Sequence, residues 1–191
     1  MSFSITDFKR QMSHDGARPN LFKVKLLAGD DKTYFDSNDN DSFVVRATSI
    51  PGATIGTVVV PYLGREVKFA GNRTFADWTV TVLNDEDFSV RAKIEEWMGN
   101  INSHNANRRK GKLAGYYGSA EVSQLSKGAE SNDGKSLRVY KFNNMFPVDL
   151  SEITLDWGDN DSIEEFTCTF AYDYWTVKAG DATHASNKVI L

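Results

Sequence analysis

Alternation of apolar and polar side chains predicts a chain built mainly from β-strands. Phe22, Val24 and Leu26 alternate with two lysines, which is the period of a half-buried strand over residues 21–27. Pro51-Gly52 and Leu63-Gly64 punctuate later segments as turns. Further strands are expected at residues 43–50, 54–60, 65–70, 75–83, 120–125, 136–142 and 152–155.

The clearest alternation lies near the end of the sequence, over residues 163–177. The side chains that would share one face are Phe166, Cys168, Phe170, Tyr172 and Tyr174. Strands usually have about five or six residues. The greater length of this pattern predicts an element that runs across a whole barrel or sandwich.

One main helix is expected over residues 87–101, because Asn-Asp-Glu-Asp at 84–87 supplies caps and negative charge at its start. The apolar face that would pack on a sheet consists of Val90, Ile94, Trp97, Met98 and Ile101. A short helical arm is expected over residues 1–16, with Ile5, Phe8 and Met12 on one face.

The polar insert at residues 28–42 and the arm at residues 178–191 are expected to leave the core as excursions. The predicted fold class is therefore mainly β, a sandwich or barrel of two antiparallel sheets with one flanking α-helix, in a single domain of residues 1–191.

The composition limits the classes of function that we expect for this chain. The chain has 191 residues, 40% hydrophobic and 25% charged, with a formal net charge of -4, which is typical of a soluble globular protein. Tight nucleic-acid binding depends on clustered Lys and Arg, and a net negative charge gives no indication of such binding. No apolar run approaches the roughly 18 residues of a membrane span, and the start does not resemble a signal peptide. Assembly in the cytoplasm without a membrane anchor is expected.

Catalytic and metal-binding motifs are not found. His14, His104 and His184 have no paired spacing, and no nucleophile elbow or phosphate loop is present, so neither an enzyme nor a cofactor is expected. The single Cys168 excludes an intrachain disulfide and a cysteine-based zinc site, and it is expected to be a small apolar residue on a buried strand face.

Two polar loops invite binding hypotheses. Asp36, Asn38 and Asn40 match the first ligand positions of a calcium loop, but Asp41 stands where glycine is required and Ala47 where glutamate is required. A solvated loop is favoured there. Arg108 and Arg109 begin a basic cluster near Tyr116 and Tyr117, which could touch phosphates, although a solvated loop or a subunit contact is favoured.

Three parts of the sequence carry a resemblance to a known family. They are Ala-Arg-Pro-Asn-Leu-Phe at 17–22, Ala-Gly-Asn-Arg-Thr-Phe-Ala-Asp-Trp-Thr-Val-Thr-Val-Leu-Asn-Asp at 70–85, and Leu-Asp-Trp at 155–157 with Asp-Tyr-Trp at 173–175. In this order they resemble the tail tube proteins of contractile-tailed bacteriophages. The insert at 28–42 and the length of the tail after Trp175 depart from that pattern.

The resemblance implies a structural virion protein. Six copies would form a ring, rings would stack into the inner tail tube, and a contractile sheath would enclose it. The implied partners are further copies of the chain, the tail sheath protein, the tape-measure protein, and baseplate and tail terminator proteins. DNA would pass through the lumen without specific binding, and lumen-facing positions are expected to be polar and net acidic or neutral.

We expect two kinds of role for individual residues. The residues that carry the family pattern are expected to maintain the fold, with the indole N–H groups bonded to partners such as the adjacent carboxylates: Arg18, Pro19, Asn20, Asp77, Trp78, Asp173 and Trp175. The residues expected to contact neighbouring subunits or rings are Asp30, Asp31, Tyr34, Phe35, Arg108, Arg109, Ile190 and Leu191.

Two other functions fit the same pattern. The tube protein of a bacterial contractile injection or secretion system would share the architecture but carry proteins instead of DNA. A monomeric β-barrel that binds a small ligand inside would need no assembly, and it would stay near 21.4 kDa in solution.

Overall fold

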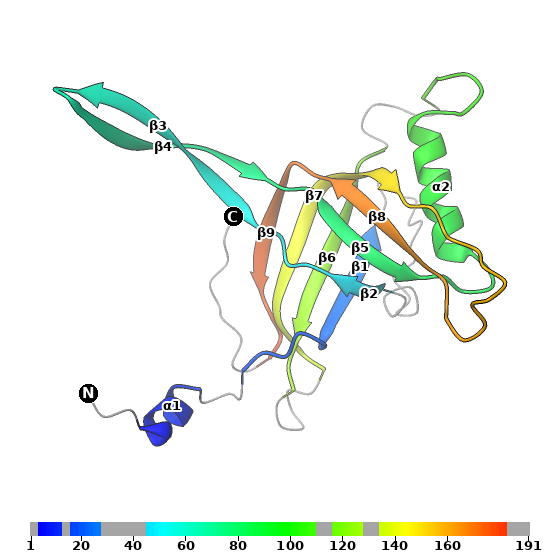
Figure 1. Ribbon diagram of the computed structural model, residues 1–191, viewed down its shortest axis with the longest axis horizontal. Coiled ribbons are helices and arrows are strands. Elements are labelled where there is room, and N and C mark those ends of the chain that lie inside the picture. Colours follow the sequence, from blue (N-terminus) through cyan, green and yellow to red (C-terminus); the bar gives the residue numbers. More distant parts are fainter. Residues whose placement is uncertain (1–3, 13–15, 28–44, 110–115, 128–133, 183–191) are drawn as a thin grey trace. The chain divides into compact units, whose positions relative to one another are not determined.

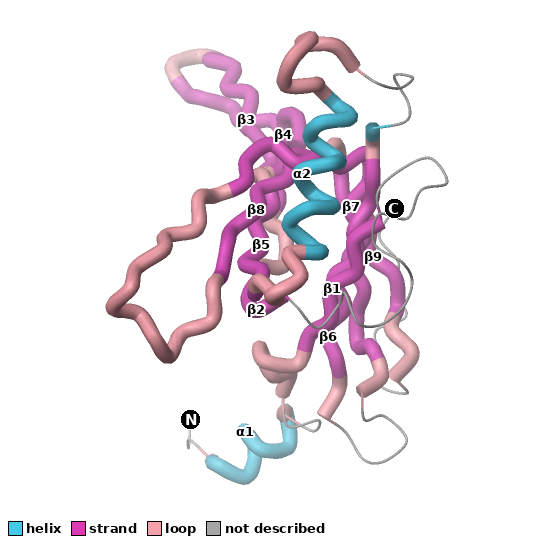
Figure 2. The backbone as a smooth tube through the Cα atoms, turned by 90° about the vertical axis from the view of Figure 1, so that its right-hand side faces the viewer, coloured by secondary structure: helices cyan, strands magenta, loops and turns pink. Residues whose placement is uncertain are grey.

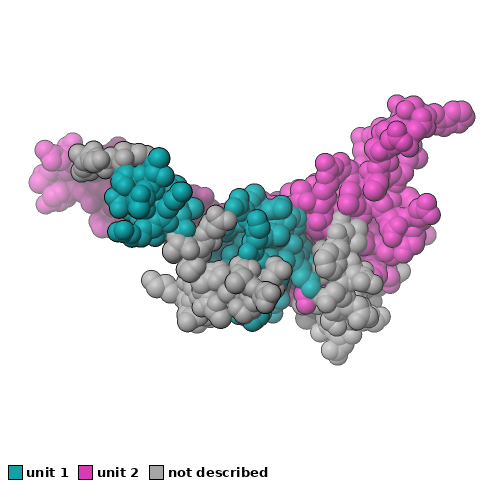
Figure 3. Space-filling model, turned by 90° about the horizontal axis from the view of Figure 1, so that it is seen from below, with its two compact units in different colours: residues 1–24, 121–141, 176–191 teal, residues 25–120, 142–175 magenta. Residues whose placement is uncertain are grey.

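The computed structural model describes residues 4–12, 16–27, 45–109, 116–127 and 134–182. The chain divides into two compact units, which Figure 3 colours separately. Unit 1 comprises residues 1–24, 121–141 and 176–191, and unit 2 comprises residues 25–120 and 142–175.

The described elements are mostly strands (Figure 1). In chain order they are α1 (Ile5–Gln11), β1 (Phe22–Leu27), β2 (Val45–Thr48), β3 (Ala53–Tyr62), β4 (Arg65–Phe75), β5 (Trp78–Leu83), α2 (Ser89–Ile101), β6 (Gly118–Leu125), β7 (Ser136–Leu150), β8 (Glu165–Ala171) and β9 (Tyr174–Ala179). One sheet has seven strands in the order β1-β6-β7-β8-β5-β2 with β9 paired to β7, and β3 and β4 form a separate two-stranded sheet. The predicted fold class is confirmed, with two sheets of very unequal size.

The core of unit 2 forms where β5 and β8 pair antiparallel. Trp78 lies opposite Phe170, Val80 opposite Cys168 and Val82 opposite Phe166, and all six side chains are buried. Residues between them, such as Thr79 and Thr169, stay at least partly exposed. The period-2 alternation of the sequence therefore defines which face of these strands is buried.

Helix α2 packs against that buried face (Figure 2). Its buried residues are Val90, Ile94 and Trp97, and the Trp97 ring lies 6.0 Å from the Phe170 ring. The helix begins after Phe88, and Asp87 Oδ1 accepts the Ser89 backbone N–H at 2.9 Å at its start. The same hydrogen bond lowers the pKa of the Asp87 carboxyl.

Aromatic stacking extends this core into β7. The Phe142 ring stacks on Trp78 at 4.4 Å and meets Tyr172 edge-on at 4.8 Å. Such pairs contribute about 0.5–1.5 kcal/mol beyond the area that they bury. Buried side chains such as Trp78, Phe170 and Trp97 therefore occupy the interior between β5, β8 and α2.

Unit 1 has a smaller core and a tight crossing. Val24, Val122 and Val177 are buried in it. Gly180 passes so close to the Ser136 backbone that a Cβ at this position would overlap it. A glycine is required there because no side chain fits.

Two expected strands are wrong. Residues 163–177 are not one strand: Asn144 adopts a φ of 54° and its Nδ2 donates to Asp173 Oδ2 at 2.7 Å, while the Asp173 N–H donates to the Asn143 carbonyl at 3.2 Å. These contacts turn the chain between β8 and β9. Residues 152–155 form no strand either, because the Ser151 hydroxyl takes the Thr167 N–H at 2.9 Å and ends the ladder.

Burial also settles the chemistry of Cys168. The side chain is fully buried, and burial, assisted by the nearby Asp149 carboxylate, raises the pKa of its thiol to about 12. The expected buried position is confirmed. Since the thiolate is the reactive form, the folded chain holds this cysteine inert.

We expect Cys168 of the native chain at pH 8 to react with a disulfide reagent at least roughly a thousandfold more slowly than in the unfolded chain, because both exposure and thiolate fraction fall. The absorbance of the thiolate that the reagent releases, followed over time with and without denaturant, gives the two reaction rates and their ratio. Equal rates would contradict the buried position.

The Phe142→Ala variant is expected to lose about 3–5 kcal/mol of unfolding free energy, because a buried ring is removed and a cavity remains. Phe69→Ala provides the matched control: the same substitution at an exposed ring in β4 should cost less than about 1 kcal/mol in the unassembled chain. Chemical denaturation measures both, and equal losses would count against this core.

Candidate assembly surface

The hairpin of β3 and β4 projects from unit 2 with water on both faces (Figure 1). Every residue of β3 is exposed, as are most residues of β4. An isolated two-stranded ribbon is at best marginally stable in water. This hairpin is therefore expected to gain stability from a partner.

One face of the hairpin is strongly apolar. In the register, Val58 lies opposite Phe69 and Val60 opposite Val67, so these side chains share a face with Tyr62. Val58 is 52% exposed and Phe69 56% exposed. We call Val58, Val60, Tyr62, Val67 and Phe69 the apolar hairpin face. Contiguous exposed apolar side chains of this kind mark an interaction surface.

The opposite face of the hairpin is mixed. Thr57, Val59 and Pro61 lie on it, paired with Ala70, Lys68 and Glu66 respectively. It carries a charge of each sign between its apolar positions. Such a face tolerates water better than the apolar hairpin face does.

The hairpin turn places an apolar side chain at the tip. Leu63 and Gly64 both have positive φ angles, 47° and 77°, as a two-residue type I′ turn requires. Asn-Gly is the preferred sequence there, because a leucine in the left-handed region costs about 1–2 kcal/mol. Leu63 nevertheless stands at the tip, 87% exposed. Strain with no gain inside the chain points to a contact outside it.

Aromatic side chains hold the base of the hairpin. The indole N–H of Trp78 donates to the Ser49 carbonyl at 3.1 Å, and that of Trp175 donates to the Gly52 carbonyl at 3.4 Å. The Phe75 ring at the end of β4 lies 6.1 Å from the Trp175 ring. The expected carboxylate partner of Trp78 is wrong, because a backbone carbonyl takes the bond and Asp77 is exposed.

Farther out, a bulge brings the two strands close together. The register shifts between Ile55 and Thr57, and a Cβ on Gly71 would lie 3.0 Å from the Gly56 carbonyl oxygen. Bulges increase the twist of a ribbon and redirect its end. This feature therefore helps to set the direction in which the apolar face points.

Other residues of the family pattern have local roles. The Gln124 amide donates to the Arg18 carbonyl at 2.6 Å and to the Leu21 carbonyl at 2.7 Å, which fixes the exposed turn of Arg18, Pro19 and Asn20 within unit 1. Asp173 is occupied by Asn144 at the break between β8 and β9.

The expected contact residues are placed only in part. Arg108 and Arg109 are exposed, and the Arg109 guanidinium lies 4.9 Å from the centre of the Tyr116 ring. Their role in contacts between copies stays a prediction. The remaining expected contact residues lie outside the described residues: Asp30, Asp31, Tyr34, Phe35, Ile190 and Leu191.

The apolar hairpin face is not among the contacts expected from the sequence. Its signal is the run Val58-Val59-Val60, which breaks the alternation and leaves apolar side chains on both faces. A strand buried on both faces would show the same run. Only the exposure of the hairpin distinguishes the two cases.

Across the described ranges, no cluster of three or more His, Cys, Asp and Glu side chains is arranged to hold a metal ion. None of the helices in the same ranges has the length and apolar character needed to cross a membrane.

Residues 17–178 match the family model described as phage tail tube protein. The tail tube protein gp19 of Enterobacteria phage T4 is 34% identical over 163 residues, which cover 85% of this chain and 93% of gp19.

Two solved assemblies contain chains of similar fold. In the six-fold symmetrised baseplate of the anti-feeding prophage, one chain is 12% identical with a TM-score of 0.59, covering 85% of this chain and 95% of that one. In the sheath-tube complex of an extracellular contractile injection system, one chain is 15% identical with a TM-score of 0.54, and the match covers 93% of this chain and 99% of that one. At these identities the similarity concerns the fold alone.

Replacing Leu63, the strained residue at the tip, should stabilise the hairpin. We expect Leu63→Asn to increase hydrogen-exchange protection of the β3 and β4 amides in the unassembled chain by roughly two- to fivefold, because asparagine adopts the left-handed conformation readily. Leu155→Asn, at another exposed leucine, should leave these amides unchanged. Reduced protection in Leu63→Asn would refute the assigned strain.

Proposed function

The chain belongs to the phage tail tube protein family, and from this premise we propose that six copies close into a ring and that rings stack into the inner tube of a contractile tail. Members of this family are structural proteins and not enzymes. The proposed task is mechanical: the tube stays rigid while a surrounding sheath contracts and drives it forward.

The observation that carries the proposal is the apolar hairpin face. It exposes Val58, Val60 and Phe69 to water on an arm that the rest of unit 2 does not cover. A second copy of the chain could cover it through a heterologous contact, in which the arm of one copy meets a different surface of the next. Contacts of this type close into rings when the rotation permits and extend along an axis when it does not.

The sheet supports ring closure in a second way. Among the described strands, the sheet ends at β1 on one side and at β2 on the other, and an edge strand is a place where a strand of another copy can pair. We infer that neighbouring copies pair or cover these edges, so that strands of six subunits line one continuous wall.

The proposed partners follow from the role. They are the tail sheath, the baseplate, the tail terminator and the tape-measure protein, and the place of action is the tail of the virion, after assembly in the host cytoplasm. The related fold in a sheath-tube complex supports the sheath contact. DNA would pass through the lumen without being held, which the net charge of -4 favours because phosphates are attracted by clustered cations.

An injection-system tube is the second candidate, and its fold is shared. The sequence favours the phage role, because gp19 of phage T4 is 34% identical, whereas the anti-feeding prophage chain and the injection-system chain named above are 12% and 15% identical. A ligand-binding barrel has less support, since aromatic side chains such as Trp78, Phe142 and Phe170 fill the interior of unit 2.

The two faces of β3 allow a matched test of assembly. Val58→Ser removes an apolar side chain from the apolar hairpin face, and we expect the concentration at which tubes form to rise by about tenfold or more. Val59→Ser makes the same change one residue along the strand on the mixed face, and it should have a smaller effect. Sedimentation and negative-stain images of the purified chain measure tube formation.

Equal effects of the two substitutions would contradict the assignment of the apolar hairpin face as the covered one. A wild-type chain that remains a particle of 21.4 kDa under every assembly condition would contradict the proposed function itself.

A further inference from the structure

A second exposed apolar surface lies in unit 2, on the loop between β7 and β8. Leu155 is 78% exposed, Ile163 is 69% exposed and Trp157 is fully exposed at 100%. A tryptophan with no cover is costly in water and is enriched at the centres of protein interfaces. We call residues 151–164 the acidic loop, for the reason that follows.

The loop is charged with one sign. It contains Glu152, Asp156, Asp159, Asp161 and Glu164, and no lysine or arginine. The apolar hairpin face ends in the opposite charge, because Arg65 lies on it opposite Tyr62, whereas Glu66 lies on the mixed face opposite Pro61. Opposite potentials combined with apolar side chains on both partners are typical of complementary interface surfaces.

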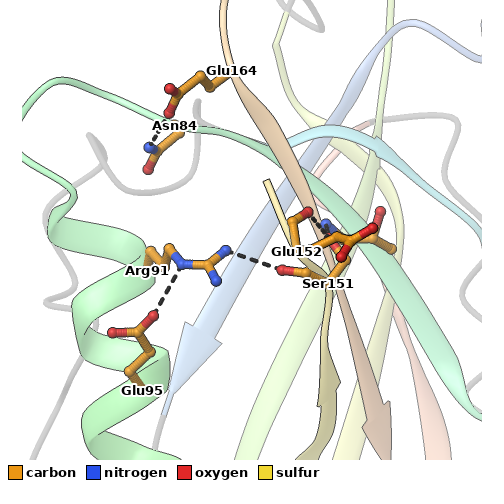
Figure 4. A network of polar contacts seen from close by, with 7 residues as sticks. Asn84, Arg91, Glu95, Ser151, Glu152 and Glu164 are labelled. Atoms are coloured by element: carbon orange, nitrogen blue, oxygen red, sulfur yellow. Dashed lines mark hydrogen bonds and ion pairs between the residues drawn. The ribbon is translucent and has the colours of Figure 1, made fainter. Parts of the chain in front are cut away.

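The acidic loop is fixed at both ends (Figure 4). Arg91 of α2 donates to the Ser151 carbonyl at 3.1 Å and pairs with Glu95 at 3.0 Å. At the other end, the Asn84 amide donates to Glu164 Oε2 at 3.0 Å. A surface that is held in place before binding loses less entropy when it binds.

Within the loop, a local turn presents the tryptophan. Asp156 Oδ1 accepts the Gly158 N–H at 2.8 Å, and the Asp159 N–H donates to the Asp156 carbonyl at 3.2 Å. These bonds hold a turn around Trp157, whose ring has no cover. The turn therefore offers the ring as an anchor instead of burying it.

The hairpin and the acidic loop lie apart within one copy. Both belong to unit 2, and they project from its opposite ends, the hairpin beyond one end of β5 and the loop beyond the other (Figure 1). An arm on one side and a complementary surface on the other are what a heterologous contact between identical copies needs.

We propose that the outer half of the β3–β4 hairpin of one copy docks on the acidic loop of a neighbouring copy. The apolar hairpin face would lie against Trp157, and Arg65, which lies opposite Tyr62 on the same face, would lie near the loop carboxylates. The proposal rests on the proposed function, because it names the surfaces that join copies in the tube. The occupant is a second copy of this chain.

Charge reversal on each side gives a test with built-in rescue. The hairpin variant carries Arg65→Glu, and the loop variant carries Asp159→Lys with Asp161→Lys. Each variant alone places like charges against each other, so we expect the concentration needed for tube formation to rise at least about tenfold. Mixed in equal amounts, the hairpin of each variant finds an oppositely charged loop on the other, and tube formation should return close to the wild-type level.

A control variant with Asp85→Lys and Glu86→Lys reverses two acids at the exposed turn before α2, and it should neither impair assembly nor rescue the hairpin variant. Circular dichroism and denaturation of each unassembled chain show that it folds. If both reversed chains fold and assemble as the wild type does, or if the mixture stays unassembled, the pairing of hairpin and loop is wrong while the proposed function stands. A wild-type chain that never assembles would overturn both.

Fluorescence provides an independent readout on unmodified residues. Of the four tryptophans, Trp78 and Trp97 are buried, Trp175 is half-buried and Trp157 is fully exposed. We expect acrylamide, a neutral quencher, to quench wild-type fluorescence more strongly before assembly than in tubes, and we expect this difference to be much smaller in Trp157→Phe. Quenching of Trp157 that is unchanged on assembly would also refute the proposed contact.

Discussion

An apolar ribbon that its own chain leaves in water is the constraint on which the rest of this structure depends. The apolar hairpin face combines five large side chains on an arm of two strands, and such an arm has little intrinsic stability. When a second copy covers this surface, apolar area is removed from water, so association of the folded monomers is favourable. A structural subunit of a tube needs a favourable free energy of association to join other copies.

Other features of unit 2 serve to aim this arm. Trp78 and Trp175 bond the backbone at Ser49 and Gly52, so two residues of the family pattern act on the segment that leads into β3. The same β5–β8 core supports the acidic loop through α2 and Asn84. A rigid core with an arm on one side and a receiving surface on the other turns weak local contacts into a repeating assembly.

The sequence predicts the parts of this fold that alternate cleanly. Strands such as β5 and β8 bury one face, and the 3.6-residue period of α2 identifies Trp97 as a core residue, so both patterns report burial directly. The break at Asp173 escapes such reasoning, because it depends on contacts with Asn143 and Asn144 far along the chain. The assembly surface escapes it too, since the valine run of β3 reads like a buried strand until its exposure is seen.

The most direct measurement is hydrogen exchange of residues 53–75 in the unassembled chain and in assembled tubes. If neighbouring copies cover the hairpin, its amides should exchange quickly in the free chain and at least about tenfold more slowly in tubes, while the β5 and β8 amides change little. Tubes in which the hairpin amides exchange as fast as in the free chain would contradict the account, because the arm would then join nothing.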